Sequence, residues 1–78
     1  MKREEFLEEC AIALQVNPGS LDEESSPVSV EMWDSMGWLS LIAMIDDKLD
    51  FTLEINELRN IKKIGDFIDL LKGKGLIE

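Results

Sequence analysis

An aspartate and a serine, Asp34-Ser35, stand directly before a run whose apolar residues recur at helical spacing. A helix N-terminus presents unpaired backbone N–H groups and the positive end of the helix dipole. A phosphodiester on the Ser35 hydroxyl would therefore sit where negative charge is stabilised. Serine and aspartate are also ordinary helix-capping residues. The spacing thus predicts either a simple helix cap or a serine that accepts a phosphate group.

The sequence contains no histidine, which limits the chemistry open to its nucleophiles. Ser-His and Cys-His arrangements cannot form, so no residue of the chain activates Ser35. Asp46 and Asp47 are neighbours that point in different directions on a helix, and we expect exposed acids. Cys10 lies on an apolar helical stripe, where a small buried side chain is typical. We therefore predict a protein that is not an enzyme and has no catalytic residues.

The acidic segment after residue 45 invites comparison with a calcium-binding loop. Five oxygen-bearing residues fall at the first, fifth, seventh, ninth and twelfth positions of a possible twelve-residue loop: Asp46, Asp50, Thr52, Glu54 and Glu57. However, Lys48 occupies the third ligand position, and Phe51 stands where such a loop needs glycine. With one cysteine and no histidine, the chain also lacks the residues for a zinc site or an internal disulfide. We predict no metal site.

Three segments carry the apolar periodicity of α-helices, at residues 3–16, 35–49 and 64–75, and we predict a short helical turn at residues 56–60. The second has the most regular buried stripe: Trp38, Leu41, Ile42, Ile45 and Leu49. Residues 17–34 hold both prolines and four serines, and we predict a long ordered loop held by a few anchors among its scattered apolar residues, which are Leu21, Val28, Val30, Met32 and Trp33. The sequence therefore predicts one all-α domain over residues 1–78, a small four-helix bundle with three longer helices, one short one, and a long first loop.

The charge balance narrows the class of partner. Seventeen Asp and Glu residues against eight Lys and Arg give a net charge of −9, which repels nucleic acid and favours partners with basic surfaces. No apolar segment is long enough for a membrane span, and the charged start of the chain does not resemble a secretory signal. We expect a cytoplasmic protein, and a small, strongly charged domain is most simply a monomer.

The run from Trp33 to Ile42, WDSMGWLSLI, resembles the Asp-Ser-Leu motif of acyl and peptidyl carrier proteins. In that family the serine accepts 4′-phosphopantetheine from coenzyme A. The runs IDDKLD at residues 45–50 and LEI at 53–55 resemble the end of the family's second helix and the approach to its short third helix. The order and lengths of the other elements also agree. The resemblance implies that Ser35 is the attachment point and that Asp34 assists the modifying transferase.

The resemblance also implies surfaces for partners and cargo. Partner enzymes with basic docking surfaces, which activate or transfer acyl groups, would meet a face formed by Met36, Leu39, Ala43, Asp46, Asp47 and Glu54. Carriers of this family shelter cargo between their helices, where the candidate residues are Leu41, Ile45, Leu58, Ile61 and Ile64. We expect Trp38 to pack in the core rather than to line an acyl pocket.

Two departures from the family pattern bear on the pathway. Met36 replaces the usual leucine, a change that conserves volume and keeps an apolar contact. Ser40 stands where many fatty-acid carriers have a glutamate that meets basic partners, so its presence favours a specialised biosynthetic pathway over bulk fatty-acid synthesis. Fatty-acid or polyketide synthesis stays possible on these residues. The alternatives are a peptidyl, aminoacyl or D-alanyl carrier, or an unmodified acidic helical adaptor.

Overall fold

The computed structural model describes all of residues 1–78 and contains four α-helices and no strand. Helix α1 spans Arg3–Leu14, α2 spans Ser35–Leu49, α3 spans Ile55–Leu58, and α4 spans Ile64–Gly73. A single 3₁₀ turn, η1, covers Pro18–Ser20. These elements confirm the predicted all-α class, with three longer helices and a short one.

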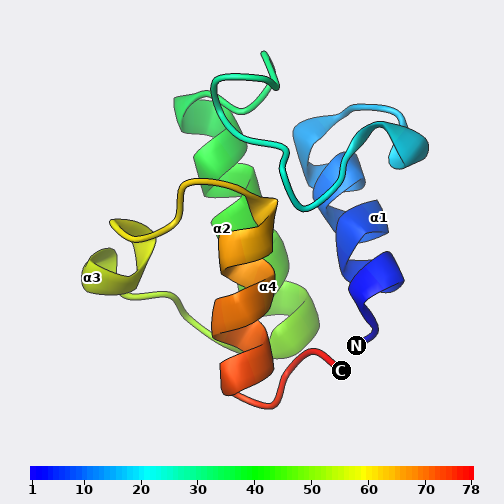
Figure 1. Ribbon diagram of the computed structural model, residues 1–78. Coiled ribbons are helices and arrows are strands. Elements are labelled where there is room, and N and C mark those ends of the chain that lie inside the picture. Colours follow the sequence, from blue (N-terminus) through cyan, green and yellow to red (C-terminus); the bar gives the residue numbers. More distant parts are fainter.

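The three longer helices pack together, while α3 lies to the side away from α1 (Figure 1). The long loop between α1 and α2 crosses the top of the bundle in this view. The two ends of the chain meet at the bottom, where the Met1 amino group donates a hydrogen bond to the Leu76 carbonyl at 3.2 Å. The Glu78 N–H donates in turn to the Met1 carbonyl at 3.0 Å. No helix combines the length and apolar character that a membrane crossing requires.

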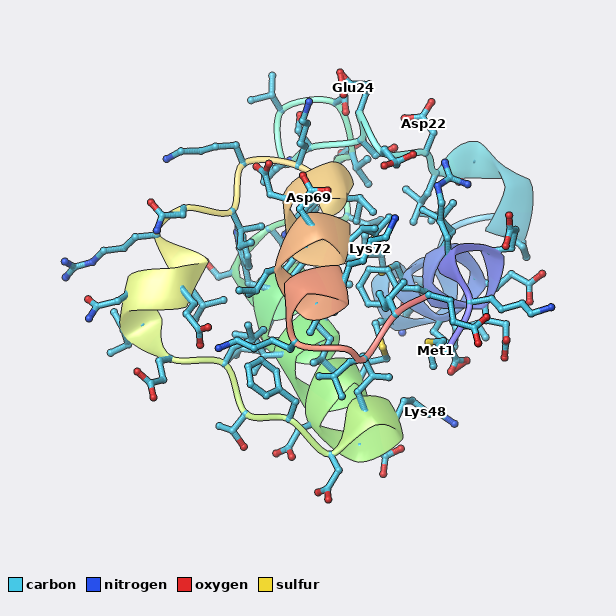
Figure 2. All side chains as sticks on the ribbon, turned by 60° about the horizontal axis from the view of Figure 1, so that its bottom comes forward. Met1, Asp22, Glu24, Lys48, Asp69 and Lys72 are labelled. Atoms are coloured by element: carbon cyan, nitrogen blue, oxygen red, sulfur yellow. The ribbon has the colours of Figure 1, made fainter.

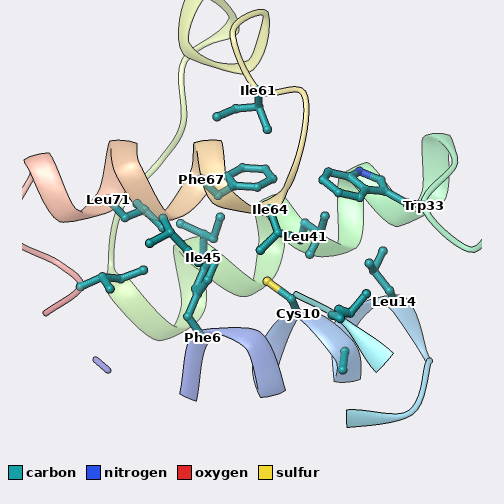
Figure 3. Close-up of a cluster of buried hydrophobic side chains, with 14 of the residues drawn as sticks. Phe6, Cys10, Leu14, Trp33, Leu41, Ile45, Ile61, Ile64, Phe67 and Leu71 are labelled. Atoms are coloured by element: carbon teal, nitrogen blue, oxygen red, sulfur yellow. The ribbon is translucent and has the colours of Figure 1, made fainter. Parts of the chain in front are cut away.

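The core is one cluster of 15 buried apolar residues contributed by all three longer helices and the loops (Figure 3). From α1 to α4, the rings of Phe6 and Phe67 lie 6.5 Å apart between centroids. Leu41 and Ile45 are the fully buried residues of α2, as its periodicity predicts. Charged groups, including Asp22, Glu24 and Asp69, point outward around this core (Figure 2).

Cys10 is fully buried in the core, as expected from its place on the apolar stripe of α1. Removal of the thiol from water disfavours the thiolate, and the neighbouring Glu9 carboxylate adds to the effect. Together they raise the pKa of Cys10 from 9.0 to about 12. The thiol is therefore a structural group that stays protonated at neutral pH.

A few of its apolar residues anchor the long first loop to the core. Leu21 and Trp33 are buried and Val30 is half-buried, whereas Val28 is 98% exposed and Met32 is 45% exposed. A segment without regular secondary structure has no period that tells inward from outward positions. The sequence therefore could not show which apolar side chains are buried.

Backbone hydrogen bonds fix the loop to the start of α4. The Ile64 N–H donates to the Ser25 carbonyl at 2.9 Å, and the Gly65 N–H donates to the Glu23 carbonyl at 2.8 Å. The first N–H groups of a helix have no acceptor within the helix, and here the loop carbonyls accept hydrogen bonds from two of them. An ion pair between Lys63 and Glu24, at 2.6 Å, lies beside these bonds. The loop is thereby tied to α4 before it reaches α2.

The short third helix differs from its predicted position. It covers Ile55–Leu58 rather than residues 56–60. The Glu57 carboxylate accepts a hydrogen bond from the Glu54 N–H at 3.2 Å, which places the start of the helix at Ile55. A local cap therefore shifts the element toward the N-terminus relative to its predicted range.

Candidate functional site

Ser35 is the first residue of α2, and it is exposed. Trp33, two residues earlier, is only 2% exposed. Trp38, one turn later, is half-buried and packs against the core. The chain is therefore held from inside on both sides of Ser35, while the serine itself faces solvent. The Ser35 hydroxyl is therefore exposed at a fixed place at the start of α2.

Asp34 is the N-cap of α2. Its Oδ1 accepts a hydrogen bond from the Gly37 N–H at 2.9 Å, and its backbone carbonyl accepts one from the Trp38 N–H at 2.9 Å. The cap that the sequence suggested is therefore present. Because Oδ2 has no partner within the protein and the residue is exposed, one carboxylate oxygen stays available to another molecule.

The first turn of α2 also offers free donors. The backbone N–H groups of Ser35 and Met36 donate no hydrogen bond within the protein, since the side chain of Asp34 reaches only Gly37. These two N–H groups lie at the positive end of a helix of 15 residues. An anionic group attached to Ser35 would find hydrogen-bond donors and a favourable dipole at this point.

Gly37 allows the preceding loop to lie against the start of α2. A Cβ at this position would clash with the Met32 carbonyl oxygen and would come within 2.9 Å of Leu14 Cδ2. Only glycine permits that approach, so Gly37 sets where the loop delivers Asp34 and Ser35. Sequence reasoning missed this residue, because a single glycine inside a helical pattern does not show what lies opposite it.

Two aromatic residues near Ser35 join a third from α4. The rings of Trp33 and Trp38 lie 5.1 Å apart between centroids, and Phe67 lies 6.1 Å from Trp33 and 5.8 Å from Trp38. Trp33 and Phe67 are nearly parallel, with an interplanar angle of 23°. The expectation that Trp38 packs in the core therefore agrees with its contacts, although the residue is only half-buried.

The residues predicted to meet partners are all exposed. Met36 and Leu39 are 69% and 60% exposed, and Ala43 follows on the same side of α2. Asp46 and Asp47 continue this side toward the end of the helix, and neither forms an ion pair. The sixth predicted residue, Glu54, is brought in from another element as the N-cap of α3.

Other exposed apolar side chains lie outside that set, and one of them borders a groove. Ile12 of α1 is 66% exposed beside the groove between α1 and α2. It lies two residues after buried Cys10, which turns it to the opposite side of the helix. Two adjoining hollows follow this groove, with volumes of about 590 and 250 Å³, and they share Ala13 and Ser40.

The five candidate acyl-pocket residues lie elsewhere. Leu41, Ile45, Ile61 and Ile64 are buried in the core, and Leu58 packs against it half-buried. None of the five lines either hollow. In the close-up of Figure 3, Ile61, Ile64 and Leu41 surround the ring of Phe67 beside Trp33. These side chains form packed core, and their role toward cargo stays a prediction.

No group of three or more His, Cys, Asp or Glu side chains is arranged to hold a metal ion. The carboxylates that fit part of a calcium-loop pattern include Asp50, which ends α2 in the left-handed conformation at φ 52°. Glu57 forms an ion pair with Lys74, the C-cap of α4, with 3.5 Å between Oε2 and Nζ. The geometry thus offers an exposed serine at a helix start and an acidic face, but no cluster of metal ligands.

Comparison with known proteins places the fold. No protein-family model and no curated protein sequence matches the chain. A solved structure does: the holo acyl carrier protein from Geobacter metallireducens, determined by solution NMR, superimposes with a TM-score of 0.80. The aligned sequences are 24% identical, and the match covers 91% of this chain and 83% of that one. The chain therefore has an acyl-carrier-like fold, as the resemblance of its motif implied.

Proposed function

We propose that this acyl-carrier-like fold serves as a carrier, in which Ser35 bears a 4′-phosphopantetheine arm and the arm holds an acyl or aminoacyl group as a thioester. The observation that supports the proposal most is the placement of Ser35. It is an exposed serine at the first residue of α2, between an aspartate cap and two unpaired backbone N–H groups. The structural neighbour is itself described as a holo acyl carrier protein.

The residues around Ser35 suit the phosphate of such an arm. The N–H groups of Ser35 and Met36 are the donors that would meet its oxygens, and the dipole of α2 favours its charge. Asp34 already uses Oδ1 to cap the helix, so Oδ2 is the oxygen through which it would help a transferase hold its metal or orient the serine. The donor set at this helix start therefore fits the group.

In this proposal the protein positions Ser35, and the transferase catalyses the modification. In the modification, Ser35 Oγ forms a bond to the phosphate of coenzyme A that bears the pantetheine, and the bond from that phosphate to the nucleotide breaks. The proton of the hydroxyl passes to a base of the transferase, because the chain has no histidine to receive it. When present, the arm supplies a thiol that activates a carboxylic acid as a thioester.

The exposed side of α2 supports the proposed partners. Met36, Leu39 and Ala43 would give a partner apolar contacts, and the unpaired carboxylates of Asp46 and Asp47 would attract basic residues. Glu54 adds charge from the start of α3. Encounters of this type are fast, reversible and sensitive to salt, which suits a carrier that must leave each enzyme.

Several pathways fit such a carrier. Ser40, in place of the glutamate common in fatty-acid carriers, supports a specialised biosynthetic pathway, with fatty-acid or polyketide synthesis as the wider class. Peptidyl, aminoacyl and D-alanyl carriers use the same arm and the same serine. Loading assays with enzymes that activate fatty acids, amino acids and malonyl groups would separate these cargo classes.

The test of the carrier function is the intact mass of the purified protein after incubation with coenzyme A and a broad-specificity transferase. We expect one phosphopantetheine mass to be added, and fragmentation to place it on Ser35. An unmodified helical adaptor would keep its original mass under the same conditions. That result, with a known carrier modified in the same tube, would contradict the proposal.

A further inference from the structure

Three aromatic rings pack against one another near the start of α2. They come from three parts of the chain: Trp33 from the end of the long loop, Trp38 from α2, and Phe67 from α4. Every pair among them is within 6.1 Å between centroids. Trp33 and Trp38 stand two residues before and three residues after Ser35, so both indoles are carried by the backbone segment that carries the serine.

The surrounding side chains leave no vacant space beside the rings. Ile64 and Phe67 are fully buried, and Ile61 is 6% exposed (Figure 3). The two hollows of the molecule lie between α1 and α2, and neither Trp33, Trp38 nor Phe67 lines them. A chain that is to be buried between α2 and α4 must therefore displace an indole.

We infer that Trp33 and Trp38 exclude long alkyl chains from the interior, so that the cargo carried at Ser35 is a short or polar acyl group that stays at the surface. This inference rests on the proposed carrier function and specifies its class of cargo. Acetyl-like, hydroxyacyl and aminoacyl groups belong to this class, whereas medium and long fatty acyl chains do not.

The physical reason is that replacing a buried indole with an alkyl chain lowers the free energy of the folded protein only slightly. An alkyl chain that replaced an indole would bury its own apolar surface while it exposed a comparable apolar surface on the ring. The favourable contacts among the three rings would be lost as well. Insertion of an alkyl chain therefore yields little net stabilisation.

The experiment compares forms of the protein loaded by a transferase with acetyl-, butyryl-, octanoyl- and dodecanoyl-coenzyme A. We expect their thermal midpoints to agree within about 4 °C, because no additional methylene is buried. The protein has two tryptophans, so two indole N–H signals in a nitrogen-15 correlation spectrum report directly on the rings. We expect both signals to stay in place along the series. A midpoint that rises with chain length, together with shifted indole signals, would overturn the inference.

Replacement of Trp38 by a smaller residue should create the missing space. In Trp38→Leu, or in the milder Trp38→Phe if the first does not fold, we expect the octanoyl form to melt at least about 4 °C above the acetyl form. Val28→Ala is the matched control, since it shortens an apolar side chain that is 98% exposed. It should behave as the unaltered protein. Absence of the chain-length effect in both Trp38 variants, or its presence in the control, would contradict the role of Trp38.

A second series separates this inference from the carrier function. In Ser35→Cys, alkyl iodoacetamides attach ethyl to dodecyl chains at the same position without a transferase. Cys10 should not compete, because it is fully buried and its pKa is about 12. If coenzyme A never modifies Ser35, the carrier proposal fails, yet this series still reports on chain exclusion. If the alkyl chains raise the midpoint with their length and shift the indole signals, the exclusion fails even where the carrier function holds.

Discussion

The Asp34 carboxylate accepts a hydrogen bond from the Gly37 N–H at 2.9 Å, and the two residues bracket Ser35 in the first turn of α2. One interaction therefore determines both where the helix begins and where the serine hydroxyl stands. Because the bond uses only Oδ1, the structural role of Asp34 and its proposed role toward a transferase involve different oxygens. The two roles can be separated by substitution.

Asp34→Ala and Asp34→Asn should differ in stability but not in modification. The alanine variant loses the cap, and we expect its free energy of unfolding in urea to fall by about 1 kcal/mol. Asparagine caps helices about as well as aspartate, so Asp34→Asn should stay within a few tenths of a kcal/mol. Both lack the carboxylate, and both should be modified more slowly by a transferase, as followed by mass. Modification of Asp34→Asn at the unaltered rate would show that the carboxylate acts only as a cap.

Gly37→Ala should destabilise the protein by about 1–3 kcal/mol in urea unfolding, because the added methyl group clashes with the Met32 carbonyl and with Leu14. Gly73→Ala is the matched control at the end of α4. No atom lies within 4 Å of a Cβ there, and helix propensity favours alanine by up to about 1 kcal/mol. Equal stability of the two variants would contradict the close approach of the loop to α2.

Cys10 should make the stability fall at alkaline pH. Its pKa is raised from 9.0 in an unperturbed thiol to about 12 in the folded protein, so above pH 9 the unfolded chain releases a proton that the folded protein retains. The stabilisation is therefore complete below pH 9 and is lost progressively as the pH rises toward 12. The slope is about 1.4 kcal/mol per pH unit within this window.

The measurement is urea unfolding of the unaltered protein and of Cys10→Ala across this pH range, since other titrating groups cancel in the comparison. We expect the stability advantage of the unaltered protein to shrink with pH. A constant difference between the two proteins would mean that the thiol is not shielded from water in the way its burial indicates.

Met36→Ser and Leu39→Ser should weaken the encounter with a transferase without affecting the fold. Both side chains are mostly exposed, so thermal midpoints should change by less than about 4 °C. The KM for the carrier should rise, because the partner loses apolar contact area. Val28→Ser removes a side chain of similar character that is 98% exposed on the long loop. An equal loss in all three variants would argue against a docking face on α2.

The helices of this protein could be predicted because their signals are local. The second helix starts and ends at the predicted residues, since an Asp-Ser pair marks its beginning and apolar residues repeat through Leu49. The third helix begins one residue earlier than predicted because the capping interaction of Glu57 determines its start. A helix of four residues is too short for its apolar periodicity to show where it begins. Short elements are determined by their caps more than by their apolar pattern.

Tertiary contacts were the part that sequence did not show. Val28 and Val30 are the same residue type two positions apart, yet one is 98% exposed and the other packs on the core. The sequence does not distinguish the two positions, because this segment has neither helical nor strand periodicity. Likewise, Gly37 matters because Met32 and Leu14 lie too close for a side chain at that position. Trp33 packs against Phe67, which is far from it in the sequence. The position of Ser35 was predictable, whereas the packing behind it was not.

The most direct measurement on the central claim is the mass of Ser35→Ala, beside the matched variant Ser40→Ala, after incubation with coenzyme A and a transferase. Ser40 is the other serine of α2 and lies five residues further along it. We predict that Ser40→Ala gains one phosphopantetheine group and that Ser35→Ala, folded by circular dichroism, gains none. Modification of Ser35→Ala would contradict the account.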